Sequence, residues 1–170
     1  LWRVMDHHRQ GAFYRHQQAQ RTWNDTPQPT TDRVTVGIMG LGELGRSVAA
    51  KLGALGFNLA GWSRTPHELP GVDCHAGPEG LTPFLQKTDI LVVLLPLTQE
   101  TEGMIDYDLL TNLRQDGPLG GPCLINAGRG RLQKEADILR ALDEGILKEV
   151  SLDVFEREPL AEESPIWQHP

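Results

Sequence analysis

Three glycines with the spacing Gly-x-Gly-x-x-Gly lie between a short apolar run and a helical pattern. The apolar run covers residues 34–39, the glycines are Gly40, Gly42 and Gly45, and the helical pattern continues to residue 55. In this context the first glycine makes a tight turn, the second lets a pyrophosphate approach the backbone, and the third lets the helix pack near the strand. The free amides of the first helical turn face the anion. The pattern predicts a dinucleotide-binding loop, and the alternative is a glycine-rich turn without a ligand. The residues of the expected loop are Gly40, Gly42, Glu43, Leu44 and Gly45.

Ser63 and Arg64 follow these glycines by roughly 20 residues, at the point where an enzyme that uses NAD places a carboxylate on the adenosine ribose. A hydroxyl and a guanidinium can bind a 2′-phosphate, and no carboxylate is present here to repel one. The pair therefore favours NADP as the cofactor, with NAD as the second choice. The alternative is that Arg64 is a solvated loop residue.

Apolar runs and helical patterns alternate along the rest of the chain, which is typical of a parallel sheet with helices on both faces. The run at 90–95 is apolar throughout, as expected of a strand that is buried on both sides, and Pro96 ends it. The predicted fold class is therefore α/β, a doubly wound parallel sheet of the Rossmann type. We expect strands at 34–38, 58–62, 72–75, 90–94, 123–126 and 149–152, and helices at 44–55, 81–87, 107–113 and 134–144.

The opening of the chain is polar and rich in Gln, His and Arg. Residues 4–23 have a helical pattern with several aromatic residues but too little apolar surface for a core of their own. This helix begins without a capping residue, so we expect the chain to be a fragment of a longer protein. Residues 24–32 contain two prolines and predict a linker. We expect residues 1–32 to form a dimerisation or interdomain element and residues 33–170 to form the dinucleotide-binding domain.

The composition of the chain argues against several classes of partner and location. The 170 residues carry a net charge of −7, and a pI near 5.3 argues against nucleic-acid and membrane-surface partners, which need clustered Lys and Arg. No apolar run approaches the ~20 residues of a membrane span. Cys74 and Cys123 have no metal-binding spacing, and we expect them to be buried free thiols of a reducing compartment. The expected location is cytoplasmic.

Three further motifs follow successive predicted strands. They read Leu-Leu-Pro-Leu-Thr at 94–98, Ile-Asn-Ala-Gly-Arg-Gly at 125–130 and Leu-Asp-Val-Phe-Glu-Arg-Glu-Pro-Leu at 152–160. Together with the glycine loop, they resemble the cofactor domain of the D-isomer-specific 2-hydroxyacid dehydrogenases. Trp-Ser-Arg at 62–64 and the ending Ser-Pro-Ile-Trp-Gln-His-Pro at 164–170 are most similar to the glyoxylate/hydroxypyruvate reductase A branch of that family.

The resemblance implies two catalytic residues. Arg129 would bind the carboxylate and keto oxygen of the substrate, and its forked, permanently charged guanidinium suits a 2-oxo acid. We expect the glycines on either side of Arg129 to let substrate approach. Glu158 would hold a histidine in its charged form, because a neighbouring carboxylate favours imidazolium. Glu156 is the rival carboxylate, and the residues alone do not choose between the two. The resemblance also implies cofactor contacts, with Asp153 bonded to the nicotinamide carboxamide; these residues are Leu95, Pro96, Ala127, Gly128 and Asp153.

The histidine that donates the proton in this family is not among the residues of this chain. The resemblance implies that this histidine lies beyond Pro170, within a Pro-His step. His169 corresponds to an earlier loop histidine of the family. We expect the other histidines to lie on the polar opening helix or near the adenine side. The resemblance therefore also implies that the substrate domain lies outside this chain.

The sequence thus predicts NADPH-dependent reduction of a small 2-oxo acid by the full-length protein, expected to be a homodimer. The rival class is a cofactor-sensing corepressor with the same fold, because fold alone does not fix function. A β-hydroxyacid dehydrogenase would need a catalytic lysine on a helix, and Lys134 and Lys148 lie in the wrong motif context for that role.

Overall fold

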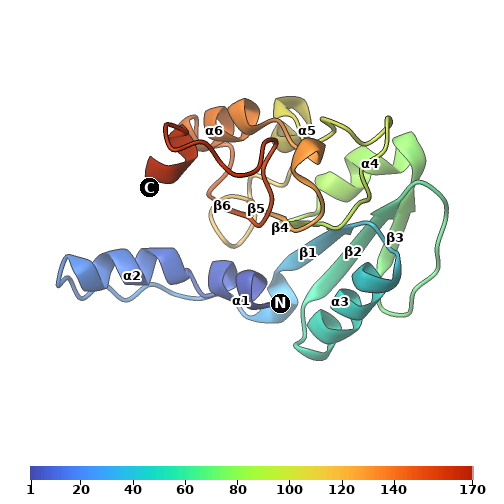
Figure 1. The fold of residues 1–170 in the computed structure, drawn as a ribbon. Helices are drawn as coiled ribbons and strands as arrows, with labels where there is room; N and C mark the ends of the chain where they lie inside the picture. The colour runs from blue at the N-terminus through green and yellow to red at the C-terminus, as the bar shows by residue number, and fades with distance from the viewer. Residues whose placement is uncertain (170) are drawn as a thin grey trace.

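Six parallel strands form one sheet in the order β3-β2-β1-β4-β5-β6 in the computed structural model, which describes residues 1–169 (Figure 1). The strand order reverses at the boundary between β1 and β4, so ligands of this fold bind beyond the carboxyl ends of these strands. This confirms the predicted α/β class with a doubly wound parallel sheet. The strands are β1 (Thr35–Met39), β2 (Asn58–Ser63), β3 (Asp73–Ala76), β4 (Ile90–Val93), β5 (Cys123–Asn126) and β6 (Glu149–Leu152).

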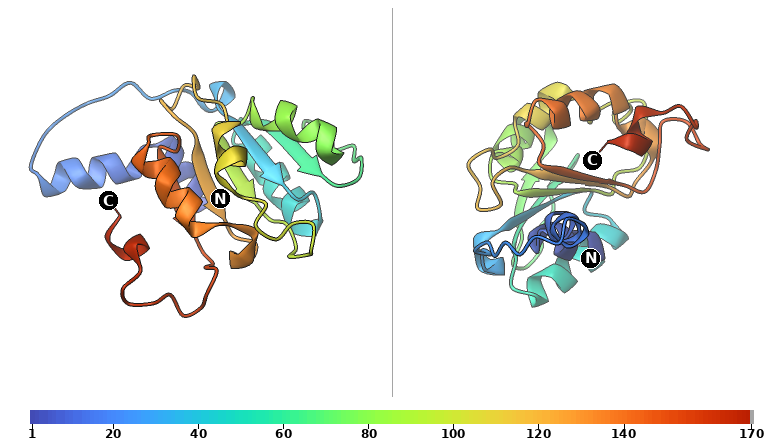
Figure 2. Two further views of the ribbon diagram at one scale, coloured as in Figure 1. Left: turned by 90° about the horizontal axis from the view of Figure 1, so that it is seen from above. Right: turned by 90° about the vertical axis from the view of Figure 1, so that its left-hand side faces the viewer.

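Helices cover both faces of the sheet, as the end-on view in Figure 2 shows. One face carries α1 and α3, and the other carries α4, α5 and α6. Strand β4 contributes to both cores, because Ile90 and Val92 pack with the first group and Leu91 and Val93 with the second. The helices are α1 (Trp2–His8), α2 (Gly11–Ala19), α3 (Glu43–Ala54), α4 (Gly77–Leu85), α5 (Tyr107–Thr111) and α6 (Glu135–Asp143), and short 3₁₀ helices span Thr31–Arg33, Gly130–Leu132 and Pro165–Gln168.

Helix α4 begins four residues before the predicted start at residue 81. Pro78 lies in its first turn, where the missing N–H has no cost because the first amides of a helix lack partners anyway. Gly77 adopts a positive φ of 64° at the start of the helix. Gly77 and Pro78 therefore start the helix earlier than the apolar pattern from residue 81 predicts.

The predicted single helix at 4–23 is wrong, because the chain breaks between α1 and α2. Gln10 adopts a left-handed conformation with φ of 53°. Beside the break, Arg15 donates hydrogen bonds to the Asp6 carboxylate at 2.8 and 3.0 Å. A Cβ at Gly11 would lie 1.9 Å from the same carboxylate, so a larger residue here would displace the Asp6 side chain from this pair. The helical periodicity of the sequence runs through this break and does not reveal it.

Helix α1 packs on the sheet, whereas the sequence had indicated an exposed polar helix. Val4 is buried in the core that contains α3. His7 and His8 are also buried. The His7 imidazole bridges two residues of β6, with Nδ1 2.6 Å from the Glu149 carboxylate and Nε2 2.9 Å from the Ser151 hydroxyl. This bridge anchors α1 to the edge of the sheet.

Replacing His7 by leucine is expected to lower the free energy of unfolding by about 1–3 kcal/mol, because the half-buried Glu149 and Ser151 side chains lose their partner. The matched control is His16→Leu on α2, where the imidazole is exposed. Urea unfolding of both variants measures the difference. Equal stability of the two variants would show that the His7 bridge does not anchor α1.

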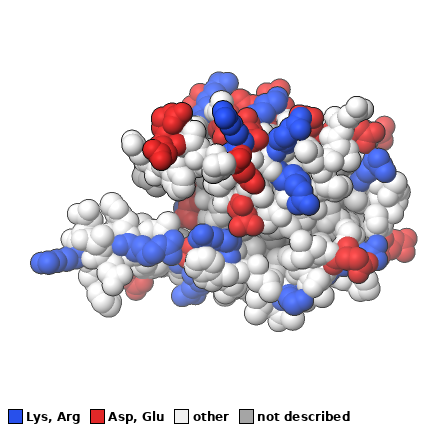
Figure 3. All heavy atoms as spheres, in the orientation of Figure 1, with Lys and Arg blue, Asp and Glu red and all other residues white. Residues whose placement is uncertain are grey.

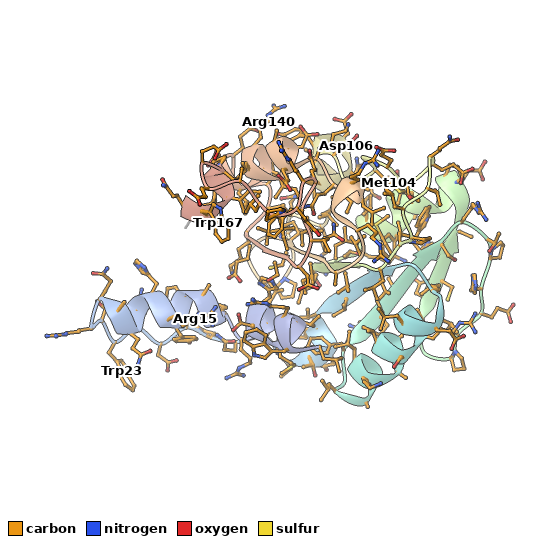
Figure 4. The ribbon with its side chains drawn as sticks, in the orientation of Figure 1. Arg15, Trp23, Met104, Asp106, Arg140 and Trp167 are labelled. Atoms are coloured by element: carbon orange, nitrogen blue, oxygen red, sulfur yellow. The ribbon has the colours of Figure 1, made fainter. Side chains whose placement is uncertain are left out.

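Helix α2 and the turn after it, residues 11–23, form an arm that extends away from the body (Figures 1 and 2). Trp23 at the tip is 96% exposed and points into solvent in Figure 4. The arm contains two arginines, Arg15 and Arg21, and no acidic residue, and blue side chains stand along it in Figure 3, whereas both signs are interspersed over the body. Docking of this arm on a second subunit stays a prediction.

The two cysteines are free and lie in different environments. Cys123 is buried in β5, and burial raises the pKa of its thiol to about 12. Cys74 in β3 is half-buried rather than buried as predicted. In the part of the chain that the structure describes, no helix combines the length and apolar character needed to cross a membrane.

Candidate active site

The loop between β1 and α3 has the geometry that its three glycines predict. Gly40 has φ of 107°, and a Cβ there would lie 2.9 Å from the Leu94 carbonyl oxygen. A Cβ at Gly45 would lie 1.9 Å from the Gly40 carbonyl oxygen, so the third glycine does permit close packing of helix on strand. Nothing lies within 4 Å of a Cβ built at Gly42. The open space at Gly42, beside the first amides of the twelve-residue α3, fits a pyrophosphate.

Ser63 is the last residue of β2 and Arg64 follows it, next to this loop. Ser63 is buried, and its hydroxyl donates to the Thr65 carbonyl oxygen at 2.7 Å, so it closes the turn. Arg64 is exposed and pairs with Glu100 in the loop after β4, with 3.2 Å between Nη1 and Oε2. Of Ser63 and Arg64, the arginine is therefore the residue whose side chain can reach a ligand, because only an exposed ion pair holds it. No carboxylate of the β2 end itself occupies the ribose position.

A cavity of about 330 Å³ opens at the carboxyl edge of β4, β5 and β6. It brings together three of the residues expected to contact the cofactor, Leu44 of α3, Ala127 after β5 and Asp153 after β6. The Ala127 amide donates to Val93 at 3.2 Å and the Asp153 amide donates to Asn126 at 3.0 Å, so both residues extend the ladder of the sheet. The remaining wall is mostly apolar, with Val92 and Ile125 among its residues, and Arg3 of α1 and Ser151 of β6 are its polar members.

The loop that carries Arg129 is held by the side chain of Asn126, a residue that the sequence analysis did not single out. The Asn126 amide nitrogen donates to the Arg129 carbonyl oxygen at 3.2 Å, and its oxygen accepts from the Gly128 amide at 3.0 Å. The exposed Arg129 guanidinium donates to the Gly128 carbonyl oxygen at 2.8 Å and forms no ion pair with any residue from 1 to 169. Most of its fork is therefore available to an anionic ligand.

The expected role of the glycines on either side of Arg129 is corrected by the packing. A Cβ at Gly130 would lie 1.7 Å from the Phe155 carbonyl oxygen, and one at Gly128 would lie 3.0 Å from the Leu95 carbonyl oxygen. These glycines make room for the protein's own backbone rather than for substrate. Consequently the loops after β4, β5 and β6 pack against one another around Arg129. The exposed Pro96 continues the first of these loops.

The structure gives the two rival carboxylates different surroundings. Glu156 caps the start of α6, since its carboxylate accepts from the Glu135 amide at 2.6 Å and its own amide donates to the Glu135 carboxylate at 2.7 Å. Glu158 is exposed and accepts only one hydrogen bond within the described chain, from the Phe155 amide at 3.0 Å. Each carboxylate thus accepts one backbone hydrogen bond, and the two differ in that Glu156 is tied to the start of α6 whereas Glu158 contacts its own loop.

Comparison with known protein families shows which family this chain belongs to. The whole chain, residues 1–170, matches the family described as D-isomer specific 2-hydroxyacid dehydrogenase, NAD binding domain. The chain belongs to the D-isomer-specific 2-hydroxyacid dehydrogenase family. Glyoxylate/hydroxypyruvate reductase A of Citrobacter koseri is 49% identical over 151 residues, which are 89% of this chain and 47% of that protein. The chain thus spans about half the length of the curated relatives that it matches.

Solved structures of this dehydrogenase family superpose closely on the chain. The NADPH-dependent glyoxylate/hydroxypyruvate reductase of Sinorhizobium meliloti, solved with NADP and sulfate, gives a TM-score of 0.96 at 48% identity and covers 99% of this chain and 53% of its own. A probable 2-hydroxyacid dehydrogenase of Rhizobium etli, solved with NADP, HEPES and L(+)-tartaric acid, gives 0.94 at 50% identity and covers 98% and 53%. The predicted family is confirmed, as is the nature of this chain as its cofactor domain.

None of the histidines described in this dehydrogenase domain is placed as a proton donor. His169 lies 3.4 Å from the Asp143 carboxylate at the end of α6, in agreement with a loop role. His67 lies in the turn after β2, with Nδ1 3.0 Å from the Ser63 hydroxyl. His75 lies on β3 beside Asp73. The position expected for the acid, beyond Pro170, lies outside this chain.

Proposed function

We propose that the full-length protein reduces a small 2-oxo acid of the glyoxylate or hydroxypyruvate type to the D-2-hydroxy acid with NADPH. The observation that carries the proposal is Arg129, whose guanidinium fork has no ion-pair partner among residues 1–169 and is held at the carboxyl edge of the sheet, in the loop after β5. Relatives that are about half identical and bear the name of this activity support it.

The cofactor would be held by the loop Gly40–Gly45 and by the end of β2. The open space at Gly42 and the amides at the start of α3 suit the pyrophosphate, and Arg64 suits a 2′-phosphate. Asp153 and Ala127 line the cavity that suits the nicotinamide end. NADPH supplies the hydride that reduces the substrate carbonyl carbon.

Arg129 would orient the substrate. Its guanidinium can donate two parallel hydrogen bonds to the carboxylate and keto oxygen of a 2-oxo acid, which fixes the carbonyl carbon at one position. Packing of the loops after β4, β5 and β6 keeps this arginine in place. Glu158 would keep the histidine supplied by the rest of the protein in its charged form, and that histidine would protonate the carbonyl oxygen.

The partners proposed for the full-length protein are a small 2-oxo acid and a second copy of itself. The exposed arm at 11–23, with Trp23 at its tip, supports the homodimer, because large exposed aromatic surface is typical of an interface. Light scattering at micromolar concentration tests this. A cytoplasmic location completes the proposal and rests on the composition and the family.

Arg64→Ala is expected to weaken binding of NADPH by about 10- to 100-fold and to leave binding of NADH nearly unchanged, because one charge-assisted phosphate contact contributes about 1.5–3 kcal/mol. The matched control is Glu100→Gln, which removes the ion-pair partner of Arg64. Because an exposed pair contributes at most about 1 kcal/mol, this change should tighten NADPH by no more than about fivefold. Calorimetric titration of both cofactors measures the effects. Equal losses of NADPH and NADH affinity in Arg64→Ala would contradict the assignment.

A further inference from the structure

Gln133 is a fully buried polar side chain between the two loops that carry Arg129 and Glu158. It follows the 3₁₀ helix Gly130–Leu132, and its side chain is 2% exposed. Its backbone is fixed, because its amide donates to the Gly130 carbonyl oxygen at 3.1 Å and the residue forms a bridge with Ile105. A buried amide in such a position requires partners for both of its ends.

The two ends of the Gln133 amide bond to different loops. Its oxygen accepts from the Asn126 side chain at 2.7 Å, and Asn126 in turn holds the loop of Arg129. Its nitrogen donates to the Val154 carbonyl oxygen at 3.1 Å, in the segment that leads to Glu158. Only this orientation of the amide forms both hydrogen bonds. In the reverse orientation the Gln133 nitrogen would face the Asn126 nitrogen, and the Gln133 oxygen would face the Val154 carbonyl oxygen. One side chain therefore connects the two loops.

The same two loops also meet through backbone. Gly130 lies against the Phe155 carbonyl group, so closely that no Cβ would fit between them. The Phe155 amide donates to the Glu158 carboxylate. A shift of the Val154 segment would therefore move both the wall behind Arg129 and the hydrogen bond that orients Glu158.

We propose that Gln133 is a positioning residue, which sets the placement of Arg129 relative to Glu158 without contacting substrate. The proposal rests on the proposed function for the roles of those two residues. Its physical basis is that a misplacement of about 1 Å, caused by a residue away from the reacting atoms, can lower the rate of an enzyme by about 100-fold. The hydrogen bonds that connect the loops stand independently of any activity.

The test uses Gln133→Met and Gln133→Glu in the full-length protein. Methionine retains the length of the side chain without hydrogen bonds. Glutamate retains acceptance from Asn126 but cannot donate to Val154 when it is ionised. Gln86→Met, at the exposed end of α4, is the matched control. We expect both changes at Gln133 to lower kcat/KM for glyoxylate by about 10- to 100-fold. The NADPH dissociation constant should change by less than about threefold, because the glycine loop and Arg64, which would hold the phosphates, follow β1 and β2, and only the nicotinamide contacts of Ala127 and Asp153 lie near the loops that Gln133 connects.

Hydrogen exchange gives a readout that does not depend on turnover. In both Gln133 variants the amides of Gly128 and Phe155 should lose protection together, whereas amides of α3 should not change. If the wild-type protein does not oxidise NADPH with glyoxylate, the proposed function fails, and joint loss of protection would still support the link between the loops. Wild-type kcat/KM together with unchanged exchange at both amides would overturn the proposal. Loss of protection throughout the domain would also overturn it, since Gln133 would then serve general stability.

Discussion

Replacing Arg129 by glutamine in the full-length protein is expected to lower kcat/KM for glyoxylate by about 10²- to 10⁴-fold. Two charge-assisted hydrogen bonds to the substrate are lost, each contributing about 1.5–3 kcal/mol. Binding of NADPH should change little, because Arg129 lies at the carboxyl end of β5, away from the glycine loop and Arg64. Steady-state kinetics together with cofactor titration measure both quantities.

The matched control is Arg131→Gln, two residues further along the chain. Arg131 is exposed and pairs with Glu102, so its charge is already compensated on the surface. This variant should retain kcat/KM within about threefold, because an exposed ion pair contributes at most about 1 kcal/mol. Similar losses in both variants would mean that positive charge in general, rather than the fork of Arg129, serves the substrate.

Glu158→Gln is expected to lower kcat/KM at alkaline pH by about 10²- to 10⁴-fold, the range in which a general acid contributes. Removal of the carboxylate charge lowers the pKa of the neighbouring histidine, since the charge had favoured imidazolium. Reduction requires the protonated histidine. The alkaline limb of the pH profile should therefore move to lower pH, by about one unit or more.

Glu156→Gln provides the comparison, because Glu156 caps α6 through the Glu135 amide. That change should lower the free energy of unfolding by at most about 1 kcal/mol, because the amide oxygen can still accept from Glu135 and only the negative charge at the start of α6 is lost, and it should leave the alkaline limb in place. The measurement is kcat/KM from pH 6 to about 10 for both variants, within the titration range of a histidine whose pKa is raised. An unmoved limb in Glu158→Gln would remove Glu158 from the acid site.

The fold could be predicted because the signals for its elements are local. The uniformly apolar run at β4 reports burial on both faces, and the glycine spacing after β1 reports the turn and the close packing of α3. The break between α1 and α2 could not be predicted from periodicity, since the helical pattern continues through it and the Asp6–Arg15 pair beside it forms only once the chain has turned. The burial of His7 depends likewise on β6, at the other end of the chain.

The residues of the candidate site could likewise be predicted only in part. Arg129 and Glu158 were identified through motifs, but the motif assigned to substrate a space at Gly130 that the Phe155 backbone occupies. Gln133 gives no signal in the sequence, because a glutamine between a turn and a helix is usually a solvated residue. Its role depends on Asn126 and Val154, which come close only when β5 and β6 pair.

The proposed reductase activity is tested most directly by adding glyoxylate to the full-length protein with NADPH. Oxidation of NADPH is monitored as the loss of absorbance of the reduced cofactor. We expect turnover that saturates with glyoxylate, prefers NADPH to NADH, and falls by about 10²-fold or more in Arg129→Gln. Tight NADPH binding without any turnover of glyoxylate or hydroxypyruvate would contradict the proposed activity. That result would favour a protein that senses the cofactor and acts by binding a partner.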